Sequence, residues 1–424
     1  MNKYDIVIVG GGTSGVSCAW NAGRLGFKTL LIEKNSFLGG SITSSLVIPA
    51  MKTSDNSINN DFFNELYKNL KEINGAITYE DGNKGWINPE LTKIVLDKML
   101  IEVGVDLRFE SSVNSIERNE KLSSYIVSID NDNIFQKTEG LLEHIETKYL
   151  VDSTGDAKIC EKLNAKFLNN FSKKSQPISL RFIMSGINLE KFANWIINYD
   201  KDRNITTSCI VENELHLSTA CTWDSSTKWA LTPIFKQAIA NGDLEEEDAN
   251  YFQVFTIAGA TNSIAFNAPR LLKEYKNVSN AYVDGRSAIL RISNFCKKYL
   301  PGFEKAYISS IANTLGIRVS NLIEGKYIYT YQDLISGKKF DNPVVISNYP
   351  VDIHSKDKDN SKLEKVNIGY QLPVESLMAK DFDNLFVIGR CISAEFEAQA
   401  ALRIIPSCFS MGEGLVKYIA KINQ

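Results

Sequence analysis

The sequence contains only three histidines, so few of its side chains could act as a general base near neutral pH. His354 ends the segment 349–354, which also contains the acid Asp352. A histidine beside an acid suits proton abstraction from a substrate, and His354 is therefore the first candidate for a catalytic base. The alternative is a histidine that is only hydrogen-bonded at a strand end. We expect His216 to be structural and His144 to lie on the surface.

Two arginines could bind an acidic or carbonyl group. Arg270 follows Asn267-Ala268-Pro269, and Arg318 ends Leu315-Gly316-Ile317-Arg318. A guanidinium can bind a carboxylate through two parallel hydrogen bonds. Either arginine could equally form a buried structural ion pair, and both interpretations stay open. Arg270 joins His354 as a candidate for the catalytic site.

A glycine-rich turn, Gly10-Gly11-Gly12-Thr13-Ser14-Gly15, follows the β-branched run 3–9. Apolar residues then recur at helical spacing to about residue 25, and a second apolar run, 28–32, ends at Glu33. A strand, a glycine turn, a helix, a strand and an acid in this order are typical of a dinucleotide site.

Each residue of this motif has a physical role. Gly10 makes the tight turn, Gly12 lets the backbone approach a pyrophosphate, and Gly15 lets the helix pack on the strand. The helix begins at Thr13-Ser14, where unpaired N–H groups and the positive end of the dipole favour phosphate. Glu33, 18 residues beyond Gly15, would accept hydrogen bonds from ribose hydroxyls.

Two later segments indicate which dinucleotide binds. Gly39-Gly40-Ser41 would let the chain wrap over the diphosphate of a large cofactor, and Ser153-Thr154-Gly155-Asp156 is a turn after a predicted strand. These segments are far apart in the sequence. FAD is long enough to need contacts from several separate segments, so this arrangement favours FAD. The sequence has no second Gly-x-Gly-x-x-Gly, so we expect no separate NAD(P)H domain.

The C-terminal segment completes the predicted FAD site. A buried strand over 383–388 leads into Gly389-Arg390, on the diphosphate side. Pro406 begins the last helix, and the N–H groups near Ser407 would then face the flavin C2 carbonyl and N1. The alternative is a helix that only packs on the core.

Several segments together resemble the FAD-dependent oxidoreductase family, within the glutathione-reductase-like flavoprotein superfamily. They are residues 4–40, 153–156, 266–270, 300–304, 315–318, 347–354 and 384–393. The resemblance implies FAD contacts at Gly10, Gly12, Gly15, Glu33, Lys34, Gly40, Ser41, Val113, Thr154, Gly155, Asp156, Gly389 and Arg390.

The sequence departs from the family at two points. After Gly316-Ile317-Arg318, many members have Glu-Thr-Arg-Arg where this chain has Val319-Ser320-Asn321-Leu322, so no role of that run can be carried over. Many members have Thr-His where this chain has Glu395-Phe396, so the role of that pair cannot be carried over. Glu395 is therefore a separate candidate for the base.

Composition excludes other classes. Lys+Arg 47 against Asp+Glu 50, with no dense basic run, gives no surface for nucleic acid. The seven cysteines form neither a Cys-x-x-Cys pair nor a zinc-like cluster, so we expect no metal and no redox disulfide. The longest uncharged run, 249–269, is too polar to cross a membrane. With no signal-peptide pattern, we expect a cytoplasmic protein.

The length of 424 residues favours two or three domains. We predict an α/β fold, in which a Rossmann-type FAD-binding domain (1–165 and 376–424) is interrupted by an α+β substrate domain (166–375). Residues 51–87 are a candidate insertion. We expect helices near 189–199, 228–240, 280–299 and 304–315, and those within 280–320 are candidates for packing on the FAD-binding domain.

The predicted function is the transfer of a hydride from a small organic substrate to flavin N5, by a dehydrogenase or oxidase. One alternative is a flavin monooxygenase that uses external NAD(P)H. Another is an FAD-binding subunit that passes electrons within a complex. The oligomeric state is not predicted.

Overall fold

The computed structural model describes the chain except residues 52, 55, 79–85, 132–141, 169–175, 221–228, 356–361 and 367. Its first sheet has the order β5-β2-β1-β8-β7-β6, and β21 pairs with the end of β8. The neighbouring strands β5, β2, β1 and β8 are parallel to one another, and β21 is parallel to β8. Strand β7 pairs antiparallel with β8 and with β6. Their bounds are β1 (Asn2–Val9), β2 (Thr29–Ile32), β5 (Asp106–Arg108), β6 (Ser111–Asn119), β7 (Ser124–Asn131), β8 (Glu143–Asp152) and β21 (Leu385–Val387).

The register of this sheet explains why the second half of the first strand, Ile6–Val9, is apolar without interruption. Val7 lies opposite Leu30 on one side and Leu150 on the other, and all three are fully buried. A central parallel strand covered on both faces needs such a run. The parallel Rossmann-type sheet that the sequence predicted is confirmed.

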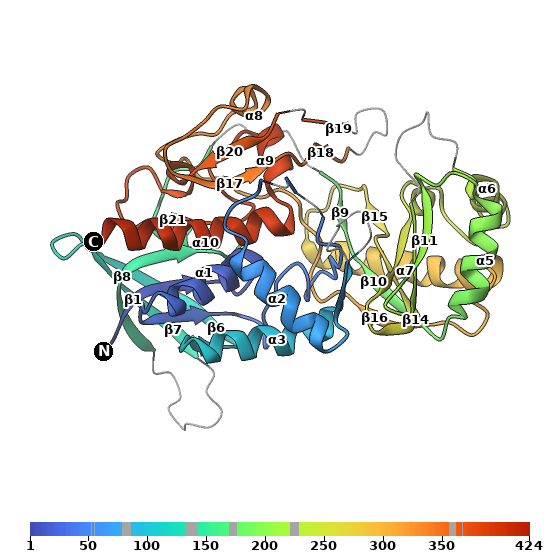
Figure 1. Ribbon diagram of the computed structural model, residues 1–424, viewed down its shortest axis with the longest axis horizontal. Helices are drawn as coiled ribbons and strands as arrows, with labels where there is room; N and C mark the ends of the chain where they lie inside the picture. The colour runs from blue at the N-terminus through green and yellow to red at the C-terminus, as the bar shows by residue number, and fades with distance from the viewer. Residues whose placement is uncertain are drawn as a thin grey trace.

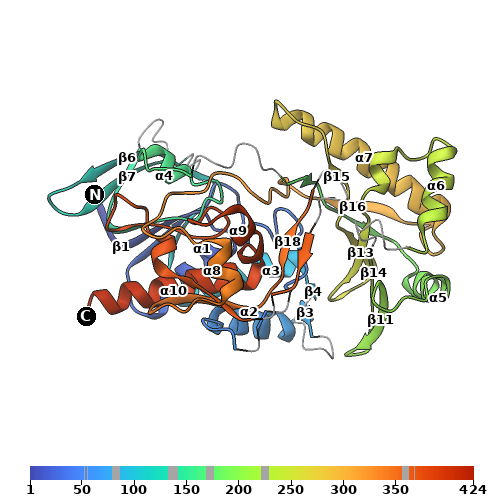
Figure 2. The same ribbon diagram turned by 90° about the horizontal axis from the view of Figure 1, so that it is seen from above.

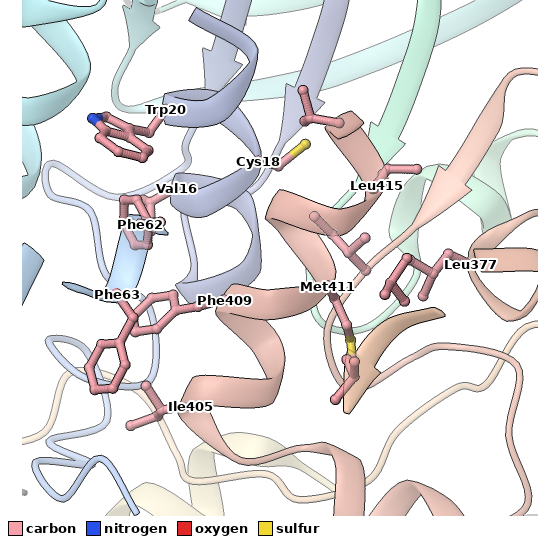
Figure 3. Packing of buried hydrophobic residues seen from close by; sticks show 14 of the residues in the cluster. Val16, Cys18, Trp20, Phe62, Phe63, Leu377, Ile405, Phe409, Met411 and Leu415 are labelled. Atoms are coloured by element: carbon pink, nitrogen blue, oxygen red, sulfur yellow. The ribbon is translucent and has the colours of Figure 1, made fainter. Parts of the chain in front are cut away.

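Helices α1 (Thr13–Arg24) and α10 (Ile405–Ile422) pack closely together beside this sheet (Figure 1). A Cβ on Gly412 of α10 would lie 2.3 Å from the Ser14 carbonyl oxygen, so only glycine permits this approach. Helices α2 (Asp61–Glu72) and α3 (Pro89–Glu102) extend the same core. Figure 3 shows Phe409 of α10 against Phe62 and Phe63, with ring centroids 5.0 and 5.6 Å apart.

The second sheet has six antiparallel strands in the order β11-β12-β13-β14-β10-β16. Their bounds are β10 (Phe182–Ser185), β11 (Thr206–Val211), β12 (Glu214–Ala220), β13 (Gln253–Ile257), β14 (Ala260–Phe266) and β16 (Tyr307–Ile311). The helix predicted over 304–315 is wrong, because Tyr307–Ile311 is an edge strand on β10.

A separate hydrophobic core belongs to this second sheet. The helices around it are α5 (Leu189–Tyr199), α6 (Thr232–Ala240) and α7 (Val278–Tyr299). Ile289, Ile292 and Phe295 of α7 lie in this core, so α7 packs on the second sheet rather than on the first. The domain boundaries near residues 165 and 375 stay a prediction.

Short elements lie between and around the two sheets. The paired strands are β3 (Ala76–Ile77) with β4 (Trp86–Ile87), β9 (Ile178–Ser179) with β15 (Arg270–Leu271), β17 (Pro343–Ser347) with β20 (Tyr370–Pro373), and β18 (Val351–Ile353) with β19 (Lys362–Glu364). The remaining helices are α4 (Lys158–Lys162), η1 (Glu246–Ala249), α8 (Tyr331–Ser336), η3 (Val374–Leu377) and α9 (Phe396–Leu402).

The two sheets lie toward opposite ends of an elongated molecule, with β9, β15 and β18 between them (Figures 1 and 2). Within the described residues, no helix has the length and apolar character that a membrane crossing requires.

Candidate functional site

The glycine turn after β1 is shaped by close backbone contacts. Gly10 has φ +104° and donates its N–H to the Ile32 carbonyl at 2.8 Å. A Cβ on Gly15 would lie 2.0 Å from the Gly10 carbonyl oxygen, so these two glycines are required by the turn itself.

Gly12 differs from its neighbours. Its φ of −73° is open to any residue, and the nearest atom to a Cβ there would be the Gly40 Cα, 4.0 Å away. The turn therefore does not itself require a glycine at this position. A glycine where the fold leaves space fits a backbone that must approach a diphosphate.

Glu33 lies at the end of β2 and is 6% exposed. Its carboxylate accepts the Gly11 N–H at 2.7 Å and the backbone and side-chain N–H groups of Asn35 at 2.8 and 2.6 Å. These bonds fix the carboxylate beside the glycine turn, and lone pairs remain for further donors. The contact of Glu33 with a ribose stays a prediction.

The Thr154 turn is held by an acid that sequence reasoning did not assign to the site. Fully buried Asp152 accepts the N–H and the hydroxyl of Thr154 at 3.0 and 2.7 Å. It also accepts the N–H groups of Ile159 and Cys160, at the start of α4. The sequence signal for Asp152 was an acid at the end of the apolar run Tyr149-Leu150-Val151.

Arg390 links this turn to the C-terminal segment. Its Nη2 lies 2.8 Å from the Asp156 carboxylate, and a Cβ on Gly155 would touch its guanidinium at 3.3 Å. A Cβ on Gly389 would lie 3.2 Å from the Ser14 Oγ, so this segment also reaches the start of α1. The predicted contacts from three distant segments therefore converge on the glycine turn.

Three polar atoms in this region are buried without a hydrogen-bond partner in the described part of the chain, Ser14 Oγ, Arg390 Nε and Ser407 Oγ. Buried polar groups rarely stay unsatisfied in a working protein. Together with the space at Gly12, they fit a bound dinucleotide whose phosphates and ring supply the partners.

The remaining predicted cofactor residues occupy the edges of this region. Gly40 approaches Gly12 closely, since a Cβ on Gly40 would lie 2.6 Å from the Gly12 Cα. The Ser41 carbonyl accepts the Val47 N–H at 2.9 Å. Lys34 is exposed, and buried Val113 lies on β6 where the pairing with β7 shifts register.

A second group of polar side chains is buried between the two sheets. His354 Nε2 lies 3.3 Å from the Asp352 Oδ2, and Arg403 Nη2 lies 3.5 Å from the same oxygen. The Arg270 guanidinium lies over the Tyr251 ring, 4.1 Å from its centroid. The structure therefore brings His354 and Arg270 into one group.

Charges within this group control its ionisation. Burial lowers the pKa of His354 to about 4, and Arg270 and Arg403 act in the same direction, whereas Asp352 opposes them. Burial disfavours the charge of Asp352 too, but His354, Arg403 and Arg270 outweigh it and hold the pKa of that carboxyl below its usual value. His354 is thus neutral and Asp352 ionised at neutral pH.

Two other arginines lie close to this group. Burial lowers the pKa of Arg181 to about 9, with a further lowering from Arg270, so Arg181 still carries its charge at neutral pH. Arg318 donates to the Pro177 carbonyl at 2.5 Å. Sequence reasoning missed Arg181 and Arg403, although each interrupts an apolar run, Leu180-Arg181-Phe182 and Leu402-Arg403-Ile404.

Glu395 lies apart from the buried group. It is exposed at the start of α9, and its Oε2 accepts the Tyr331 N–H at 2.8 Å. This contact connects α9 to α8 and gives the carboxylate a structural role. Its assignment as a base stays a prediction.

The two other histidines have local partners. His144 Nδ1 lies 2.8 Å from the Ser128 Oγ, and buried His216 lies 3.1 Å from the Thr256 hydroxyl.

A pocket of about 400 Å³ lies away from these residues. Its lining residues are Ser54, Asn56, Lys339, Ile346, Asn348, Ile368, Gly369 and Gln371. None of the residues predicted for the site lines it.

Comparison with known proteins gives a consistent result. The sequence profile of the family described as FAD dependent oxidoreductase matches residues 5–417. Digeranylgeranylglycerophospholipid reductase of Methanococcus vannielii is 26% identical over 180 residues, which are 40% of this chain and 43% of that protein. Dihydrolipoyl dehydrogenase of Trypanosoma brucei brucei is 45% identical over 49 residues, 12% of this chain and 10% of that protein. The alignments thus span less than half the length of these relatives.

Solved structures include a similar chain, the geranylgeranyl bacteriochlorophyll reductase-like protein from Thermoplasma acidophilum. It has a TM-score of 0.47 and 13% sequence identity, with 100% of this chain and 80% of that chain covered.

Proposed function

Because this chain belongs to the FAD dependent oxidoreductase family, we propose that it is a dehydrogenase or oxidase that acts on a small organic substrate between its two sheets. The enzyme class and the cofactor follow from the family. The mode of reaction, the site residues and the narrower placement in the glutathione-reductase-like superfamily are part of the proposal.

The observation that carries the cofactor assignment to particular residues is the space at Gly12 beside the unpartnered atoms Arg390 Nε and Ser407 Oγ. We assign the diphosphate to the N–H groups at the start of α1 and to Gly389-Arg390. Glu33 would accept the ribose hydroxyls, and the start of α10 would face the flavin ring.

FAD supplies the two-electron oxidation when it is bound, and the protein supplies position and proton transfer. Neutral His354, oriented by ionised Asp352 at 3.3 Å, is in the protonation state that accepts a proton. Because Arg270 and Arg403 depress its basicity, His354 accepts a proton more readily once a negative group neutralises them.

The cofactor assignment is tested by replacing Glu33 with Ala. The change removes the acceptor of the Gly11 N–H and the proposed acceptor of the ribose hydroxyls, so FAD should bind at least about tenfold more weakly. The measurement is fluorescence titration of FAD into the apoprotein. Glu90→Ala is the control, because Glu90 pairs with Lys93 on the surface of α3. Equal FAD affinity in Glu33→Ala and wild type would remove Glu33 from the site.

A further inference from the structure

The buried group between the two sheets contains several positively charged side chains. It contains Arg181, Arg270 and Arg403, from three different parts of the chain. Among the described residues, the ion pairs of this group are those of Asp352 with Arg403 and with His354. His354 is neutral, and within the described residues no carboxylate pairs with buried Arg181. Buried charges that are not matched by partners are costly to a folded protein.

The same group contains polar atoms that lack a partner. Arg181 is 9% exposed and Gln176 is 5% exposed. Within the described residues, Arg181 Nε, Gln176 Nε2 and Arg403 Nε are buried and make no hydrogen bond. All three are N–H donors, so the missing partner is an acceptor.

This group also lies next to the proposed cofactor site. The Cys408 thiol, in the first turn of α10, contacts the Arg403 carbonyl at 3.6 Å. Burial raises the pKa of Cys408, while Ser14, Thr13, Arg390 and Arg403 oppose that shift. Cys408 therefore lies between the start of α1 and Arg403, with the cofactor residues on one side and the arginines on the other.

We propose that Arg181, Arg270 and Arg403, with Gln176, bind the carboxylate of the substrate, which makes the substrate a small organic acid. This inference rests on the proposed function, because it assumes that a substrate reacts beside FAD. Planar guanidinium groups match a carboxylate in bidentate geometry. The Tyr251 ring lies under the Arg270 guanidinium and would hold this group in a fixed orientation.

A phosphate of FAD offers the same oxyanion chemistry, so the test separates the two sources. The FAD-loaded protein is titrated with benzoate and, at equal ionic strength, with neutral benzamide, and binding is followed by calorimetry. Wild type should bind benzoate at least about tenfold more tightly than benzamide. Arg181→Met and Arg270→Met should each lose about tenfold or more in benzoate affinity and retain the FAD affinity of wild type. Arg181→Lys should recover part of the benzoate affinity.

Arg286→Met is the matched control, because Arg286 also lies over a tyrosine ring, that of Tyr282, but on the exposed surface of α7. It should bind benzoate as wild type does. Circular dichroism confirms that each variant is folded, as expected where an apolar side chain replaces a buried cation.

Three outcomes overturn the inference. One is wild-type protein that binds FAD but not benzoate, which leaves the proposed function standing. Another is equal affinity for benzoate and benzamide. The third is a tenfold loss of FAD affinity in Arg181→Met and Arg270→Met with benzoate binding unchanged, which would assign the arginines to the cofactor. A wild-type protein that binds no FAD contradicts the proposed function itself.

Discussion

His354 shows how its surroundings set the chemistry of a single residue. A histidine beside an aspartate would ordinarily hold its proton more tightly, yet burial, Arg270 and Arg403 together lower its pKa to about 4. The outcome depends on residues far apart in the sequence. A reader of the sequence could therefore select His354 as a candidate, but could not predict its charge.

The low pKa of His354 predicts a dependence of stability on pH. The unfolded chain binds a proton to this residue below about pH 6.5, whereas the folded chain does so only below about pH 4. Stability should therefore fall as the pH drops through this window, by about 2 kcal/mol from this residue at pH 4.5. His354→Gln should lose less stability than wild type between pH 7 and pH 4.5 in urea unfolding. Parallel losses in the two proteins would show that His354 does not titrate in this way.

The residues of the buried group were only partly predictable. Arg270 and His354 were selected from the sequence, because few side chains of their types suit proton transfer or carboxylate binding. Arg181 and Arg403 were not selected from the sequence, because only the fold brings their distant segments together. Glu395 was selected from the family position, whereas its carboxylate accepts the Tyr331 N–H.

The element that defines the cofactor site is the turn between β1 and α1. Two of its glycines are required by the fold, because a side chain on Gly10 or Gly15 would collide with backbone within 2.4 Å. The fold does not require a glycine at position 12. We propose that Gly12 is a glycine because the diphosphate approaches the backbone there.

This difference predicts opposite results for two similar substitutions. Gly12→Ala should unfold in urea within about 0.5 kcal/mol of wild type as apoprotein, yet lose at least about tenfold in FAD affinity. Gly15→Ala should instead destabilise the apoprotein by several kcal/mol, since α1 must move away from β1. Normal FAD binding by Gly12→Ala would show that the diphosphate lies elsewhere.

Elements were predictable where local pattern and tertiary setting agree. Ile6–Val9 and Leu30–Ile32 are continuous apolar runs within parallel strands. Asn88 followed by Pro89 is a typical helix start, and the Asn88 side chain accepts the N–H groups of Glu90 and Leu91. The segment 304–315 failed because its apolar residues also fit helical spacing. Pairing with β10 makes Tyr307–Ile311 a strand, and the sequence alone does not contain that partner.

At the scale of the whole molecule, two hydrophobic cores meet at the buried polar group. Arg181 directly precedes β10 and Arg270 begins β15, whereas Asp352 lies on β18 and Arg403 follows α9, which packs on β18. Asp352 therefore stabilises the junction as well as orienting His354.

Removing this one negative charge should weaken the junction. Asp352→Asn should lower the free energy of unfolding by on the order of 3 kcal/mol, because the arginines lose their described counter-ion. If the arginines bind carboxylates, formate should restore more stability to Asp352→Asn than to wild type, at equal ionic strength. Thermal unfolding with formate and with chloride measures this difference in stability. An equal increase in stability in the two proteins would contradict carboxylate binding by the arginines.

The most direct test of the whole account is the anaerobic absorbance of the bound flavin during mixing with pairs of small carboxylic acids and their amides. We predict a yellow protein whose flavin bands bleach with the acid of at least one pair, and far more slowly with the matching amide. Bleaching by NADPH alone, with no organic substrate present, or equal rates for acid and amide, would contradict the account.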